Sequence, residues 1–199
     1  MKNLYLRSML AAACAVTLAA CGGSGGNLYL QGQVYGLAKD GLILKNGDES
    51  LPVTAGVSGF TFTKLLNTDD HYDITIEQQP KGAVCTITNG SGKATTYNMG
   101  STIVTCTTNT YPLTGAITGL TADKLTLIIG GNSTSPLAGA TAYTFPAVAD
   151  GAVYNISVLT NPTGQICRFA GSPSADGHDT VGTMGSAATT AATLACVAQ

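Results

Sequence analysis

Charged side chains are scarce in this chain of 199 residues. Lysine and arginine together number 9, aspartate and glutamate number 11, and charged residues make up 10% of the chain, against about 25% in an average soluble domain. A surface that binds nucleic acid needs clustered basic residues. Five of the basic residues are instead spread among acids in the first half of the chain: Lys39, Lys45, Lys64, Lys81 and Lys93. The composition therefore excludes a nucleic-acid partner.

Apolar runs of membrane-spanning length are also missing. The uncharged run at 9–20 is shorter than the about 20 residues that a transmembrane helix requires, and Lys2 and Arg7 precede it. A basic segment followed by a short apolar segment is typical of an export signal. Removal of residues 1–20 takes both basic residues away, so 9 − 2 = 7 basic and 11 acidic residues remain and the net charge becomes −4.

The stretch Leu18-Ala19-Ala20-Cys21 closes this apolar run. It resembles the lipobox of bacterial lipoproteins. The resemblance implies that residues 1–20 are a signal peptide, that the Cys21 thiol is diacylated and that the new amino terminus is acylated. The alternative is an ordinary secretory signal with a chance cysteine. Because each buried CH₂ contributes roughly 0.8 kcal/mol, two or three acyl chains anchor a protein firmly, and we expect the membrane to be a partner through this lipid.

The residues after Cys21 bear on where the protein is held. In Gram-negative lipoproteins an aspartate at the next position is the usual signal for inner-membrane retention, whereas this chain has Gly22. The resemblance therefore implies a protein of the cell envelope, attached to the outer membrane. Residues 22–26 read Gly-Gly-Ser-Gly-Gly, a flexible spacer, and five extended residues span at most about 18 Å. We thus assign 21–27 to a lipid-anchored linker that holds the first folded element close to the headgroups.

The remainder of the chain consists of two copies of one pattern, at 28–110 and 111–199. Both copies contain the same short segments in the same order. GQVYGL at 32–37 returns as GAITGL at 115–120, and YDITI at 72–76 returns as YNISV at 154–158. We interpret the copies as separate domains, joined by a short connection near residues 109–112, where Pro112 precedes a strand that opens at Leu113.

Each copy has the apolar alternation of β-strands. Tyr72, Ile74 and Ile76 alternate with polar residues, turn signals such as Asn46-Gly47 separate the runs, and helical periodicity is nearly absent. The piece at 185–194 is expected to be a loop that leads into the last strand. Seven strands are expected in the first copy, at 28–36, 41–45, 51–54, 58–63, 72–77, 83–88 and 102–108. Short strands with frequent turns predict an all-β protein made of two tandem antiparallel β-sandwiches.

A finer resemblance is carried by two tyrosines. Asp150-Gly151-Ala152-Val153-Tyr154, with Asp70-His71-Tyr72 at the equivalent place, is similar to the tyrosine corner of immunoglobulin and fibronectin type III folds. The resemblance implies Ig-like domains, with each tyrosine hydroxyl bonded to backbone a few residues upstream. The alternative is that both are ordinary strand residues. As a whole, residues 28–199 resemble bacterial lipoproteins that carry tandem Ig-like repeats.

Four cysteines remain outside the leader and the lipid site, two in each copy. Among the three possible connectivities, only Cys85 with Cys106 and Cys167 with Cys196 respects the repeat, and an exported protein lies in an oxidising compartment. Each bridge is expected to contribute about 3 kcal/mol to stability. Zinc is the competing interpretation, but the chain has no C-x-x-C spacing and only two histidines. We predict two disulfides and no metal or other cofactor.

Sequence motifs for catalysis are missing: no G-x-S-x-G and no complete phosphate-binding loop occurs. Asp176, His178 and Asp179 form the best remaining cluster, which could hold a metal or supply a base, or be a solvated loop. The acids of the first copy could include calcium ligands or could simply form turns. They are Asp40, Asp48, Glu49, Asp69, Asp70 and Asp73. We predict a non-catalytic structural or binding module whose partner is an envelope protein or a glycan. The alternative is a small envelope hydrolase or metal-dependent enzyme that uses the Asp176 loop.

Overall fold

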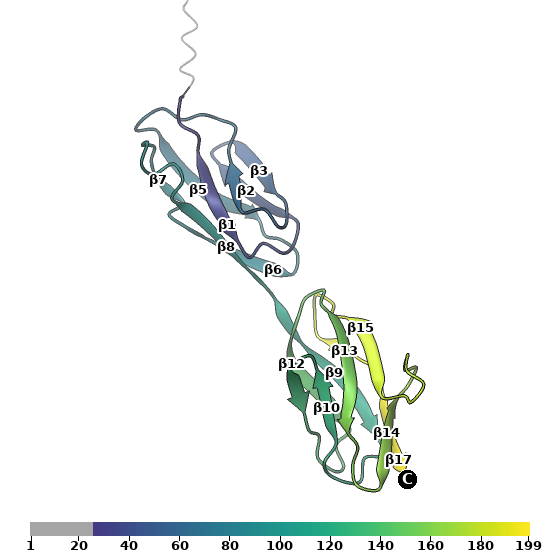
Figure 1. Ribbon diagram of the computed structural model, residues 1–199. Coiled ribbons are helices and arrows are strands. Elements are labelled where there is room, and N and C mark those ends of the chain that lie inside the picture. Colours follow the sequence, from purple (N-terminus) through teal and green to yellow (C-terminus); the bar gives the residue numbers. More distant parts are fainter. Residues whose placement is uncertain (1–25) are drawn as a thin grey trace, which may run out of the picture.

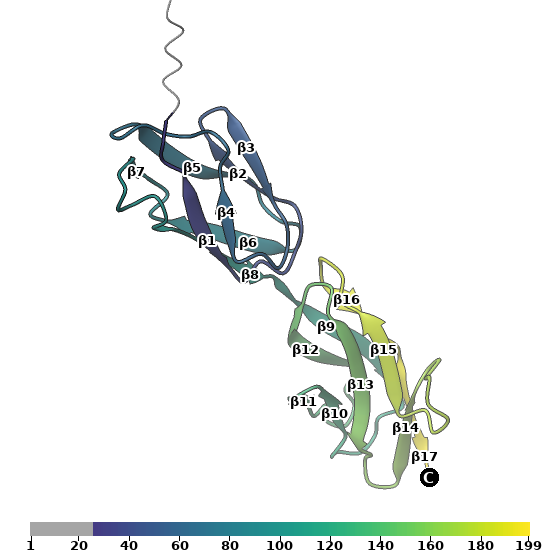
Figure 2. The same ribbon diagram turned by 45° about the horizontal axis from the view of Figure 1, so that its top comes forward.

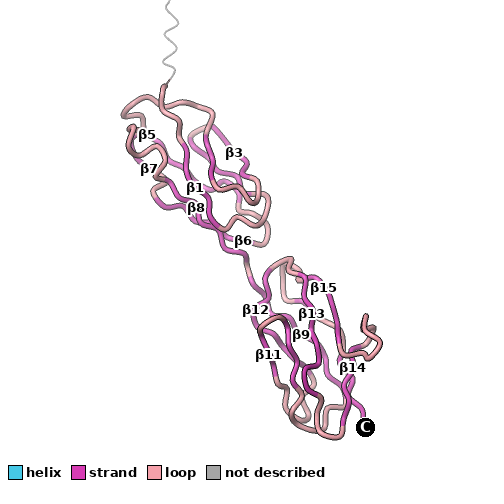
Figure 3. Tube along the Cα trace, viewed as in Figure 1, coloured by secondary structure: helices cyan, strands magenta, loops and turns pink. Residues whose placement is uncertain are grey.

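The computed structural model describes residues 26–199 as strands joined by loops and turns (Figure 3). Among these residues there is no helix that is long and apolar enough to cross a membrane. The predicted signal peptide at 1–20, Cys21 and most of the predicted linker lie outside the described residues. The all-β prediction is confirmed for the part of the chain that the structure describes.

Eight strands form the first repeat, in two four-stranded sheets (Figure 1). One sheet has the order β4-β1-β8-β6, with β1 (Gln31–Tyr35), β4 (Gly59–Thr61), β6 (Ala83–Thr88) and β8 (Thr102–Thr108). The other has the order β3-β2-β5-β7, with β2 (Leu42–Asn46), β3 (Glu49–Val53), β5 (His71–Gln78) and β7 (Ser91–Lys93). The predicted strands at 83–88 and 102–108 match β6 and β8.

The second repeat has the same strand order. Its first sheet is β12-β9-β17-β14, with β9 (Thr110–Thr118), β12 (Ala142–Ala149), β14 (Gln165–Phe169) and β17 (Leu194–Ala198). Its second sheet is β11-β10-β13-β15, with β10 (Thr126–Ile129), β11 (Asn132–Thr134), β13 (Val153–Thr160) and β15 (Asp179–Thr183). The short β16 (Thr189–Thr190) pairs with β9, in the segment expected to be a loop (Figure 2).

Strand β7 is the element that the sequence did not predict in the first repeat. Ser91-Gly92-Lys93 contains no apolar residue, so it lacks the alternation by which strands are recognised. It is held by its antiparallel pairing with the start of β5, where Tyr72 lies opposite Gly92. The pairing partner, rather than the composition of the segment, makes it a strand.

Each repeat contains parallel strand pairing, whereas antiparallel sheets were predicted, and in the second repeat the short β16 also runs parallel to β9. The first strand of each repeat runs parallel to the last, β1 beside β8 and β9 beside β17. Because these strands run in the same direction, the chain enters each sandwich at one end and leaves it at the other. Figure 1 shows the result, with the two sandwiches end to end and the C-terminus far from residue 26.

The sandwich architecture is shared with Ig-like domains, but the strand order is not. Ig constant domains place strands A, B, E and D in one sheet and C, F and G in the other. Here the second and third strands of each repeat are paired neighbours in one sheet, as in β2 with β3. Each repeat is therefore a two-sheet β-sandwich whose connectivity differs from that of an Ig constant domain.

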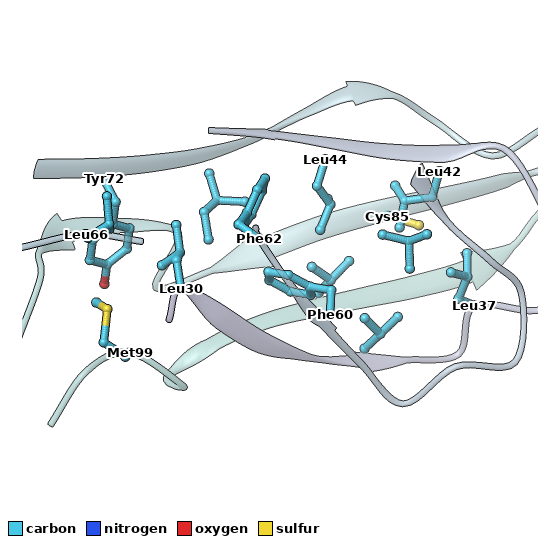
Figure 4. Close-up of a cluster of buried hydrophobic side chains, with 14 of the residues drawn as sticks. Leu30, Leu37, Leu42, Leu44, Phe60, Phe62, Leu66, Tyr72, Cys85 and Met99 are labelled. Atoms are coloured by element: carbon cyan, nitrogen blue, oxygen red, sulfur yellow. The ribbon is translucent and has the colours of Figure 1, made fainter. Parts of the chain in front are cut away.

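Two separate clusters of buried side chains fill the two sandwiches. One consists of residues between Leu28 and Cys106, and the other of residues between Leu113 and Cys196. Figure 4 shows the first, with Tyr72, Leu66 and Met99 at one end of the core and Leu37 towards the other. Each sheet draws its strands from one repeat only, so each repeat has its own sheets and its own core.

Candidate functional sites

Both predicted disulfides form, and each joins directly opposed residues of neighbouring strands. Cys85 is paired with Cys106 across β6 and β8, and Cys167 with Cys196 across β14 and β17. All four residues are buried. In antibody domains the disulfide links the two sheets, whereas here it holds an edge strand to its neighbour within one sheet. The disulfides therefore fasten β6 and β14, the outermost strands of their sheets.

A glycine stands against each bridge at the same place in the repeat. Gly36 and Gly119 have φ of 70° and 72°, and a Cβ at either position would lie 2.3 Å or 2.2 Å from the carbonyl oxygen of Cys106 or Cys196. Any larger residue would combine a strained backbone with a clash against the disulfide-bonded strand. This close approach explains why the Gly-Leu pair at 36–37 recurs at 119–120.

The two tyrosines of the predicted tyrosine corner have a different role. Tyr72 and Tyr154 are buried, and their rings lie against Gly92 and Gly182, the residues opposite them in β7 and β15. Among residues 26–199, neither tyrosine hydroxyl forms a hydrogen bond to upstream backbone. A different buried tyrosine, Tyr143, donates its hydroxyl to the Ala192 carbonyl. The tyrosine-corner bond is therefore absent. The space left by the facing glycine decides where each ring packs.

The Asp176 loop brings together two of its three predicted residues. Asp176 Oδ2 lies 3.3 Å from His178 Nδ1, and Asp176 Oδ1 accepts a hydrogen bond from the His178 backbone N–H. The Ser174 side chain and the His178 backbone lower the pKa of Asp176. Asp179 instead begins β15, opposite Ser157. Among residues 26–199 no three His, Cys, Asp or Glu side chains are close enough to share a metal ion.

Two acids of the first repeat, Asp40 and Glu49, bind backbone amides of neighbouring loops. Asp40 accepts a hydrogen bond from Ala55 N–H, and Glu49 accepts hydrogen bonds from the N–H groups of Thr63 and Lys64. Asp123 caps Ala138 N–H in the second repeat as Asp40 caps Ala55 in the first. These carboxylates act as loop caps, which is the turn-forming interpretation of the two that the sequence allowed.

A single residue, Asn109, connects the two sandwiches. β8 ends at Thr108 and β9 begins at Thr110. The Asn109 N–H donates to the Gly82 carbonyl of the first repeat at 2.9 Å, and its carbonyl accepts from the Asp150 N–H of the second repeat at 2.9 Å. Strand β9 starts earlier than predicted and passes through Pro112. Proline has no backbone N–H to donate, and the facing strand β12 has a bulge between Phe145 and Val148, opposite this residue, where the regular pairing is interrupted.

Lys39 and Asp150 form an ion pair across this junction. Lys39 Nζ donates to the Asp150 carboxylate at 2.9 Å and to the Asp150 backbone carbonyl at 2.8 Å, and the Asp150 side chain is only 7% exposed. The Lys39 and Ser186 side chains lower the pKa of Asp150. A Cβ at Gly82, whose φ is 78°, would lie 2.4 Å from the Asp150 carboxyl carbon. Any larger residue at position 82 would therefore clash with the Asp150 carboxylate.

This contact was not found from the sequence. The two partners lie 111 residues apart, and neither stands in a motif that predicts the other. Asp150-Gly151 was interpreted only as part of the predicted tyrosine corner. A clue was available in the boundary itself, since a connection of a few residues forces the loops on both sides of it into contact.

No family model matches the chain, and no curated protein matches it.

Proposed function

We propose that this protein is a lipid-anchored, non-catalytic module of the bacterial cell envelope. It carries two Ig-like β-sandwich domains and presents them, end to end, to an envelope protein or a glycan. The observation that carries the proposal is the junction, where one residue separates the sandwiches and both of its backbone groups are bonded, one to each domain. A tandem array with such a short, bonded connection holds its far domain at a set distance from the point of attachment.

The direction of the strands supports the same role. The chain enters each sandwich at one end and leaves at the other, because the first and last strands are parallel. A lipid at Cys21 would be joined to the free end of the first sandwich by a spacer of at most about 18 Å. The second sandwich is then the part held farther from the bilayer.

Attachment is tested by labelling. Palmitate supplied to cells should enter the wild-type protein, and the Cys21→Ser variant should stay unlabelled and be released from outer membranes by washing. Cys14 is the other cysteine of the first 21 residues and lies within the apolar run at 9–20. Cys14→Ser is therefore the matched control and should behave as wild type. Label that persists in Cys21→Ser would refute the anchoring proposal.

The spacer role is tested by small-angle scattering of the exported Cys21→Ser protein. We expect an elongated particle with a narrow distribution of domain separations. A broad distribution, with domains that move independently about Asn109, would contradict the role of a spacer of set length.

A hydrolase or metal-dependent enzyme at the Asp176 loop is the second candidate. The contact between Asp176 and His178 is the observation that favours it. It ranks below the first because both partners belong to one turn, and Asp176 is mostly solvent-exposed. Calorimetric titration with Zn²⁺ separates the two proposals: saturable binding that is lost in His178→Ala would favour the enzyme.

A further inference from the structure

The end of the first sandwich at which the described chain begins carries two exposed tyrosines. This end, here the N-terminal end, comprises residues 26–30 and the loops at 62–70 and 94–101 (Figure 1). Tyr97 lies in the last of these loops and is 97% exposed, the highest value for a large hydrophobic side chain among residues 26–199. Tyr29, 59% exposed, lies at the start of the described chain.

The loop that carries Tyr97 is well anchored on both sides. Ala94 and Met99 are buried, and Figure 4 shows Met99 beside Tyr72 at the end of the core. The Asn98 side chain accepts hydrogen bonds from the Thr95 N–H and hydroxyl and donates to the Lys93 carbonyl at 2.6 Å. Tyr97 is therefore held out into solvent by a structured loop.

Hydrogen bonds join the segments of the N-terminal end to one another. Leu28 N–H donates to the Leu66 carbonyl, Gln31 N–H to the Met99 carbonyl, and Asp69 N–H to the Ala94 carbonyl. The chain is thus fixed to this end from residue 27 onwards. Only five residues, 22–26, separate it from Cys21, and they reach at most about 18 Å. If Cys21 carries lipid, this end lies next to the headgroups.

We propose that Tyr97, with Tyr29, docks the N-terminal end of the first sandwich on the headgroup region of a zwitterionic lipid surface. This inference rests on the proposed lipid at Cys21. Tyrosine suits the contact, because its ring is apolar while its hydroxyl stays hydrated, and such side chains are enriched at membrane interfaces. The contact adds a second point of attachment to that of the lipid and so sets the angle of the tandem domains to the bilayer.

Charge favours a zwitterionic surface over an anionic one. The acids at or beside the N-terminal end outnumber the bases, with Asp48, Glu49, Asp69 and Asp70 against Lys64 and Lys93. Phosphatidylethanolamine presents no net charge to these acids, whereas phosphatidylglycerol repels them. The contact therefore depends on the tether and on the aromatic rings, and the chain without lipid is not expected to bind vesicles.

The chain contains no tryptophan, so Tyr97→Trp introduces a single fluorescent reporter. The lipidated full-length variant is reconstituted into vesicles of phosphatidylethanolamine and phosphatidylcholine. We expect its emission to shift to shorter wavelength and to be quenched by lipids brominated near the headgroup. The matched control is Tyr35→Trp, because Tyr35 is also an exposed aromatic of the same sandwich, 52% exposed, but ends β1 at the junction side. Its emission should remain that of a tryptophan exposed to water and should not be quenched by the brominated lipids.

The outcomes separate the inference from the proposed function. If Cys21 is labelled with palmitate but Tyr97→Trp behaves as Tyr35→Trp does, the docking contact is refuted and the anchor stands. If Cys21 is unlabelled, the anchor itself fails. Quenching of Tyr97→Trp that increases when phosphatidylglycerol is added would overturn the zwitterionic assignment. Quenching that decreases with phosphatidylglycerol, and is absent in the double variant with Cys21→Ser, supports the proposal as stated.

Discussion

The Lys39 ammonium of the first repeat and the Asp150 carboxylate of the second lie 2.9 Å apart across the domain junction. This ion pair differs from the surface pair of Lys45 and Glu77, whose atoms are 3.4 Å apart and whose side chains are both well exposed. Surface pairs contribute little because solvent screens them. The Asp150 carboxylate is shielded by the junction, and its ammonium partner also binds the adjacent backbone carbonyl, so it can restrict the relative motion of the domains.

Replacement of Asp150 by asparagine is expected to loosen the junction without unfolding either domain. The substitution removes the charge that binds Lys39, while the backbone bonds of Asn109 and both cores remain. Small-angle scattering should show a broader distribution of domain separations than in wild type. Glu77→Gln is the control, because it removes an ion pair within one sheet, and it should leave the distribution unchanged. An equal effect of both substitutions would show that the junction pair has no special role.

The same junction should loosen in acid. The Lys39 and Ser186 side chains hold the pKa of Asp150 below its ordinary value, which is about 3.9 for a free aspartate. A lowered pKa in the closed junction means that the stabilisation is complete above the ordinary value and is lost as the pH falls through the lowered one. Scattering profiles recorded from pH 7 down to pH 2 should widen only below about pH 4. The Asp150→Asn variant should show a broad distribution of domain separations at every pH. If the wild-type distribution broadens between pH 7 and 5, a titrating group other than Asp150 is responsible.

The disulfides should stabilise each domain separately. Cys167→Ala opens a bridge that closes 29 residues and should cost the second domain about 3 kcal/mol. Hydrogen exchange resolves the two domains, and we expect faster exchange in β14 and β17 with unchanged exchange in β6 and β8. Cys85→Ala is the reciprocal control and should reverse this pattern. Similar acceleration in both domains from one substitution would mean that they unfold as a unit.

Sequence patterns were sufficient for the fold class and for the pairing of the cysteines. Apolar alternation, as in Tyr72, Ile74 and Ile76, depends on neighbouring residues only, and the cysteines occupy equivalent places in a repeat that is visible without a structure. These features are local or periodic. They could therefore be read before any contact between distant residues was known.

What the sequence did not predict depends on contacts between distant segments. The parallel pairing of β1 with β8 is fixed by the packing of the whole sandwich and not by either strand alone. Tyr154 was interpreted through the upstream Gly151, whereas the glycine that decides its position is Gly182, opposite it in β15. The sequence assigned no role to Tyr97, because a single tyrosine in a polar loop forms no recognisable motif. Its proposed role depends on its position at the N-terminal end of the folded domain.

Glycines that face aromatic rings should be intolerant of even one added methyl group. A Cβ at Gly115 would lie 2.2 Å from the Tyr143 ring, whereas at Gly131 it would meet nothing within 4 Å, and neither residue has the positive φ that strains other side chains. Gly115→Ala should therefore destabilise the second domain by about 1–3 kcal/mol through overpacking, and Gly131→Ala should change its stability little. Denaturant unfolding of both variants measures the difference. Equal stabilities would mean that the Tyr143 ring moves aside without cost.

The first repeat should fold alone. Its two sheets end with β8 at Thr108 and its buried cluster ends at Cys106. Apart from the continuous chain, its bonds to the second repeat are the contacts around Asn109 and Lys39. Residues 26–110, expressed in an oxidising compartment, should give a β-type circular dichroism spectrum and a cooperative melt, because a domain of this size with a disulfide can bury a sufficient core. The Asp150→Asn full-length protein provides the comparison, since its first domain also lacks the ion pair and should melt at a similar temperature. If the fragment is unfolded while the full chain melts in a single transition, the two sandwiches depend on each other for folding, and the junction is part of the core rather than a connection between domains.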